Sequence, residues 1–309
     1  MATRLREYAG GVELLTHWRP AEAAHTERAG RLSAGRRERA ARGGRDPVED
    51  FLWDYYALRP RDLVRWHPGV GVALADDGAL GWRAQARWVA RVDGGVTLDV
   101  SAFMADRGDG VAWIHGLLTA VADRPPFLAC FGWHEWAMVH RQEVHRHPLP
   151  LRLGQAGTDA VVESAQIRCS HYDAFRFFTP AAAPLNQLQP TRATQPALEQ
   201  PGCLHANMDL LKYAHKLGPA CPGSLVLDAF ELALQIRRLD MAASPYDCRG
   251  HGLEPVPVET AAGRAAYAAA QRGFALRAAA LRRRLLAVTT ALGAGLRPGA
   301  PSSPGSGCP

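Results

Sequence analysis

The longest regular pattern in this 309-residue chain is a seven-residue repeat of large apolar side chains between residues 260 and 292. The repeating positions are Tyr267, Phe274, Leu281 and Val288. Ala278, Leu285 and Leu292 widen this stripe to a packing face on one long helix. A helix of this kind is stable only when other elements cover its apolar face, so the chain is expected to build a largely helical fold.

Shorter patterns predict further helices and a small sheet. Val-rich alternation indicates short antiparallel strands at 70–74, 88–92 and 96–100, with a hairpin turn at Asp93-Gly94-Gly95. Residues 167–178 are predicted as another strand, followed by a polar loop at 180–201. Helical spacing is found at residues 22–45, 48–58, 109–123, 158–165, 204–217 and 224–241. The expected fold class is α+β, mostly helical around a small antiparallel sheet.

The overall composition is that of a globular protein, with 47% apolar and 21% charged residues. No window holds the roughly 18–20 uncharged apolar residues of a membrane span. The amino-terminal residues lack the apolar segment of a secretory signal, so we expect a cytoplasmic protein without membrane contact. The six cysteines are scattered without a Cys-x-x-Cys pair and are expected to be free thiols.

Positive charge gathers at the two ends of the chain. Of the net charge of +6, residues 1–45 carry +5 and residues 264–309 carry +7, which leaves −6 in the middle. We therefore predict a basic extension at 1–46, a single globular domain at 47–293 ending in the long basic helix, and a disordered Pro/Gly/Ser tail at 294–309. The terminal arginines suit contacts with DNA phosphates, although a solvated helix explains the same charge.

Three His/carboxylate pairs are the clearest candidates for chemistry. They are His134 with Glu135, His171 with Asp173, and His205 with Asp209. An i, i+2 pair shares one face of a strand, and an i, i+4 pair shares one face of a helix. One hypothesis is a divalent metal site (zinc, iron or manganese) in an enzyme acting on a small molecule. Its ligands would be His134, His171, Asp173, His205 and Asp209.

A second hypothesis uses the carboxylates without any cofactor. Hydrolysis of an N-glycosidic bond needs a carboxylate beside the sugar and aromatic rings that stack on an extruded base. Glu135 and Asp173 are the candidate catalytic residues, and Trp133, Trp136 and Tyr172 are the candidate stacking residues. The same rings would also suit an ordinary core.

A family resemblance favours this second hypothesis. It is carried by His134-Glu-Trp-Ala-Met-Val, by the segment 168–178 (Arg-Cys-Ser-His-Tyr-Asp-Ala-Phe-Arg-Phe-Phe) and by the segment 198–209 (Leu-Glu-Gln-Pro-Gly-Cys-Leu-His-Ala-Asn-Met-Asp). Over residues 47–286 the chain resembles a group of actinobacterial proteins commonly labelled 3-methyladenine DNA glycosylase. The resemblance implies excision of an alkylated purine from DNA.

Three functions therefore follow from the sequence as hypotheses. The first is a DNA glycosylase, with Arg282, Arg283 and Arg284 as candidate phosphate contacts. The second is the metal-dependent enzyme, and the third is a binding protein in which the His and Asp residues are structural. The sequence leaves the oligomeric state open.

Overall fold

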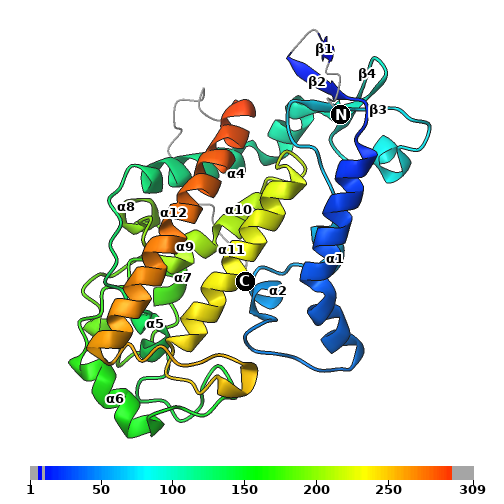
Figure 1. Cartoon of the computed structure of the whole chain (residues 1–309). Helices are drawn as coiled ribbons and strands as arrows, with labels where there is room; N and C mark the ends of the chain where they lie inside the picture. Colours follow the sequence, from blue (N-terminus) through cyan, green and yellow to red (C-terminus); the bar gives the residue numbers. More distant parts are fainter. Residues whose placement is uncertain (1–5, 9–10, 294–309) are drawn as a thin grey trace, which may run out of the picture.

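The computed structural model describes residues 6–8 and 11–293, with the side chains described from residue 11 onward. It is an α+β fold dominated by helices, which confirms the predicted class (Figure 1). The α-helices with at least five residues are α1 (Arg19–Ala41), α2 (Phe51–Tyr55), α3 (Pro60–Val64), α4 (Val100–Ala122), α5 (Trp133–Ala137), α6 (Gly154–Ser164), α9 (Leu204–Met208), α10 (Leu210–Lys216), α11 (Gly223–Ala242) and α12 (Ala261–Ala291). Two four-residue helices, α7 (Tyr172–Phe175) and α8 (Gln195–Leu198), lie in the connections.

The small sheet is mixed, whereas the sequence predicts an antiparallel one. Its strands are β1 (Arg6–Tyr8), β2 (Val12–Leu15), β3 (Val72–Ala75), β4 (Val89–Val92) and β5 (Gly95–Leu98), in the order β1-β2-β3-β5-β4. The β4–β5 hairpin is antiparallel, as predicted, but β2 and β3 are parallel. Three helices separate β2 from β3 and return the chain to the same end of the sheet, which is the connection that parallel strands need.

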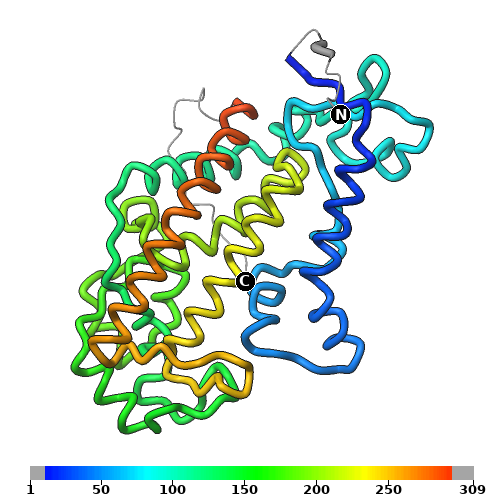
Figure 2. The backbone as a smooth tube through the Cα atoms, in the orientation of Figure 1, coloured from blue at the N-terminus to red at the C-terminus, as the bar shows by residue number. Residues whose placement is uncertain are grey.

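The long carboxyl-terminal helix is confirmed and forms one wall of the bundle. Its buried face contacts α4, α9, α10 and α11, and α11 runs beside it in both views (Figures 1 and 2). The helix is capped by Thr260, whose side-chain oxygen accepts a hydrogen bond from the Gly263 backbone N–H at 3.0 Å. Tyr267 and Leu285 are wholly buried on the predicted face. The bundle core therefore lies between α4, α10, α11 and α12.

The amino-terminal region is part of the fold and not a separate extension. Strand β2 joins the sheet, and α1 packs against α3 and α11. The buried face of α1 carries His25, Ala29 and Ser33, one per turn. Small side chains let two helices approach closely without a large apolar stripe, which is why periodicity does not reveal this contact. The predicted tail at 294–309 lies outside the described residues.

The strand predicted at 167–178 is wrong. Ile167 makes a single bridge to Asn186, and the segment then enters the short helix α7. The Asn186 side chain accepts from the Cys169 N–H at 2.7 Å and donates to the Cys169 carbonyl at 2.9 Å. This amide takes the place of a neighbouring strand, so the segment stays extended without a ladder.

Two further findings concern the predictions for the cysteines and for membrane-spanning segments. The five cysteines among the described residues are free thiols, as predicted. No helix in the described part of the chain is both long and apolar enough to cross a membrane.

Candidate metal centre

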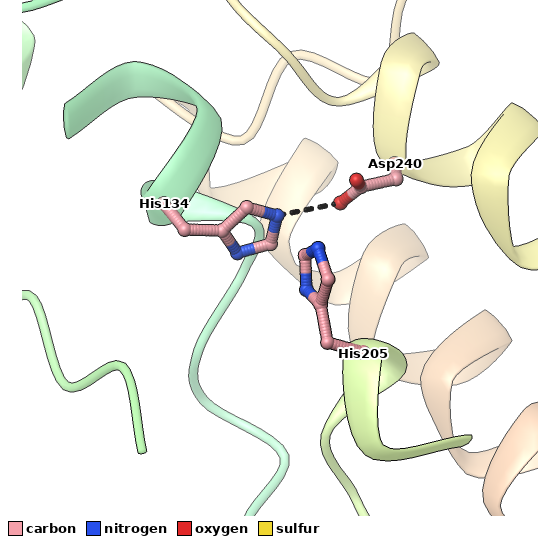
Figure 3. Close-up of side chains that lie close together, drawn as sticks. All are labelled: His134, His205 and Asp240. Carbon is pink, nitrogen blue, oxygen red and sulfur yellow. Dashed lines mark hydrogen bonds and ion pairs between the residues drawn. The ribbon is translucent and has the colours of Figure 1, made fainter. Parts of the chain in front are cut away.

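Three helices bring His134, His205 and Asp240 together in the bundle core (Figure 3). His134 belongs to α5, His205 to α9 and Asp240 to the last turn of α11. One ligand atom from each lies within 4.8 Å of the other two. His134 Nε2 is 2.8 Å from Asp240 Oδ1, and the centroids of the two imidazole rings are 4.3 Å apart. We call these three residues the first triad.

A second triad, His171, Glu199 and Asp209, lies next to the first. The rings of His171 and His205 are stacked with centroids 5.3 Å apart, so the two triads form one continuous cluster. Each carboxylate of the second triad has its own hydrogen-bond donor. Gln195 Nε2 donates to Glu199 Oε1 at 2.6 Å, and the Tyr56 hydroxyl donates to Asp209 Oδ1 at 2.7 Å. Such partners fix carboxylates in the way that ligands are oriented around metals.

His171 is the least satisfied polar group of the cluster. It is fully buried, and neither of its ring nitrogens makes a hydrogen bond. Its Nε2 nevertheless lies 3.3 Å from Glu199 Oε1 and 3.4 Å from Asp209 Oδ2. Two ligand atoms that each lie about 2.0–2.2 Å from a tetrahedral zinc ion are roughly 3.3–3.6 Å apart from each other. These distances therefore fit the edges of a metal coordination sphere.

A buried ion network supports the first triad. Arg237 Nη1 lies 2.9 Å from Glu135 Oε1 and 3.4 Å from Asp240 Oδ2, and Arg237 Nη2 lies 3.1 Å from His147 Nε2. The Arg237 guanidinium also lies 3.9 Å from the centroid of the Phe51 ring. The Asp240 carboxylate thus interacts with both Arg237 and His134. The Glu135 carboxylate pairs with Arg237 and does not belong to the triad.

The protonation of the histidines differs within the cluster. Burial, together with nearby His134, lowers the pKa of His205 well below its ordinary value, so this ring is neutral and keeps a lone pair. Burial also acts to lower the pKa of His171, but Glu199 and Asp209 outweigh it and raise this pKa. Asp240 outweighs burial in the same way and raises the pKa of His134. The carboxylates therefore attract a cation, either a proton on imidazole or a metal ion.

The histidines of the three predicted pairs meet in space, but none of them forms a triad with its predicted carboxylate partner. His205 and Asp209 lie one helical turn apart but belong to different triads. His134 belongs to the first triad with His205, and His171 belongs to the second with Asp209. Asp173 does not join the cluster because His171 precedes helix α7 and the predicted strand geometry is absent. The Asp173 carboxylate lies instead 3.5 Å from Lys212 Nζ and 3.3 Å from Arg176 Nε.

The candidate stacking residues are mostly core residues. Trp136 is fully buried, and its indole N–H donates to the Ala243 carbonyl at 2.9 Å. Trp133 is 5% exposed and packs edge-on against Trp136. Only Tyr172 of the three is half-buried. In this conformation the two tryptophan rings are therefore covered by protein.

The three consecutive arginines of α12 point in different directions. Arg282 is 2% exposed and donates to Asn207 Oδ1 at 2.8 Å, so the prediction of a phosphate contact at Arg282 is wrong. Arg284 pairs with Asp228 at 2.6 Å, and Arg283 is exposed. Successive helical residues are turned by about 100°, so three in a row cannot share one face.

Two residues of the triads were not among the sequence candidates. Asp240 follows Arg237 on the apolar face of α11 that contains Phe230, and charged residues on such a face are a signal for a buried site. Glu199 stands in a connection without periodicity, and no pattern around it predicts burial.

Comparison with known proteins adds no assignment. No family model matches the chain, and neither the curated proteins nor the solved structures contain a match.

Proposed function

We propose that the protein is a metal-dependent enzyme that acts on a small molecule at the two triads. The observation that carries the proposal is His171, a buried imidazole without a hydrogen bond that faces two oriented carboxylates. Buried polar groups are nearly always satisfied, so an exception of this kind supports an ion.

The donor atoms suit zinc, iron or manganese. The first triad offers two imidazoles and one carboxylate, a set used by non-haem iron sites, and the second offers one imidazole and two carboxylates. His134 Nε2 and Asp240 Oδ1 lie 2.8 Å apart, and a divalent ion would replace the proton that these two atoms share. A bound divalent ion would activate water or polarise a substrate oxygen.

Accessibility favours a small substrate. The six triad residues are at most 7% exposed, so duplex DNA has no direct access to them. Lys212 reaches from the half-buried Asp173 to Asp209 and is the charged group between the cluster and the surface. Asp209 outweighs the burial of Lys212 and raises its pKa, so Lys212 stays positively charged and attracts an anionic or polar substrate.

The proposal is tested by the metal content of the purified protein after exhaustive dialysis. We expect near-stoichiometric zinc, iron or manganese in the wild type and loss of this metal in His171→Ala. His25→Ala is the matched control, because His25 is also buried but its Nε2–H donates a hydrogen bond to the Leu63 carbonyl oxygen at 2.9 Å, outside the cluster. A wild-type protein without metal, or a His171→Ala variant that keeps it, would overturn the proposal.

A DNA glycosylase is the second candidate. Besides the sequence resemblance, it is favoured by the cations around Asp173, where Lys212, Arg176 and Arg192 could meet a phosphate. Base release from methylated duplex DNA by the metal-free protein, lost in Asp173→Asn, would support this function. Metal-loaded protein that binds no DNA and releases no base would exclude it.

A further inference from the structure

A cavity of about 310 Å³ lies between the small sheet and the α10–α11 junction, away from the triads. Its size is at the lower end of the range for small-molecule pockets, about 300–1,000 Å³. The walls are largely aliphatic. Leu74 and Val96 contribute from the sheet, and Val226 contributes from the first turn of α11. A ligand here would need an apolar body.

The lining of the cavity is positively charged. Three arginines and one aspartate are its charged lining residues, which gives a net charge of +2. Arg83 is paired with Glu22, and Arg87 lies 2.6 Å from Asp106. The aspartate, Asp62, already pairs with Arg59 outside the lining, whose Nε lies 3.1 Å from Asp62 Oδ2. Arg65 is exposed and makes no ion pair with any described residue, so it is available to a ligand.

An exposed aromatic ring stands beside this arginine. Trp82 is 43% exposed, although tryptophan is usually covered in a folded protein. The guanidinium carbons of Arg83 and Arg65 lie 4.7 Å and 5.4 Å from the Trp82 ring centroid. The ring and the two cations form a surface on which the polar end of an apolar molecule could rest.

We infer that this cavity binds a small apolar carboxylate, with the hydrocarbon body between the sheet and α11 and the carboxylate on Arg65. One unpaired arginine balances a single negative charge, which favours a carboxylate over a doubly charged phosphate monoester. Arg65 can hold a carboxylate through two parallel hydrogen bonds. The inference does not rest on the metal centre.

Isothermal titration calorimetry with decanoate tests the proposed carboxylate site, and decanol and decyltrimethylammonium serve as the neutral and cationic counterparts. Decanoate should bind in a saturable way, and at least about tenfold more tightly than decanol. Arg65→Glu should weaken decanoate binding by a similar factor. Arg91→Glu is the matched control, because Arg91 is an exposed arginine of β4 outside the cavity lining.

Val226→Phe tests the place of the hydrocarbon body, because the larger ring would fill the cavity. We expect this variant to lose decanoate binding while its urea midpoint stays close to that of the wild type. Equal binding of decanoate and decanol, or unchanged binding by Arg65→Glu or Val226→Phe, would overturn the inference. Self-association that Val226→Phe abolishes would identify a second copy of the chain as the occupant instead and would also overturn it.

Discussion

Replacement of Arg237 by methionine tests whether paired charges hold the network beside the first triad. Arg237 is fully buried, and its guanidinium lies between the carboxylates of Glu135 and Asp240. Methionine keeps much of the apolar stem but removes the charge and the guanidinium that lies over the Phe51 ring. The variant therefore leaves two buried carboxylates without their arginine.

The expected loss of stability is large. Breaking a buried ion pair by removing one partner costs about 3–5 kcal/mol. The pKa of Glu135 gives a similar magnitude: burial acts to raise it, but Arg237, together with His134 and His147, outweighs burial and holds the pKa at about 2 instead of 4.5. This shift corresponds to about 3 kcal/mol in favour of the charged form. Such a loss is a large part of the stability of a typical domain, about 5–15 kcal/mol.

Urea denaturation of metal-free protein measures the effect, with Arg238→Met as the matched control. Arg238 is the next residue of α11 and also pairs with a glutamate, Glu49, at 2.7 Å, but its side chain is 46% exposed. An exposed pair contributes at most about 1 kcal/mol. Glu135→Gln should recover part of the loss in Arg237→Met, because it removes one of the unpaired charges. Equal losses in the two arginine variants would refute this reasoning.

Three further predictions concern packing and metal binding. Gly263→Ala should destabilise the protein by about 1–3 kcal/mol in urea, because the new Cβ would lie 2.0 Å from the Pro257 carbonyl oxygen. Gly273→Ala in the same helix meets no atom within 4 Å and should instead stabilise by about 0.5–1 kcal/mol; the same sign for both changes would contradict the packing argument. A chelator should lower the urea midpoint of the wild type but not of His171→Ala. The free energy of unfolding of the wild type should fall by about 2.7 kcal/mol if the free metal had been at 100 times its Kd. Trp136→Phe should cost about 1–3 kcal/mol, through lost volume and an unpaired buried carbonyl, and differential scanning calorimetry that shows no shift would place this ring outside the core.

Local patterns were sufficient where the physical cause is local. The stripe of α12 is read from side chains that recur every seven residues, and the β4–β5 hairpin follows from Asp93-Gly94, where Gly94 adopts a positive φ of 72°. The i, i+4 spacing of His205 and Asp209 also indicated a helical turn, and the two residues do lie in consecutive turns. In these cases the next few residues determine the backbone.

The sequence by itself determined the mostly helical class, the long packing helix and the neighbourhoods of His134, His171, His205 and Asp209. Only the tertiary structure decided how they combine, because His134 meets Asp240 across 106 residues and His171 meets Glu199 across a loop without periodicity. It also turned Asp173 away from the triads, since the Asn186 amide replaces a strand partner for the segment before it. Periodicity records which side of an element faces inward, but the partner across the core is set by how the helices pack.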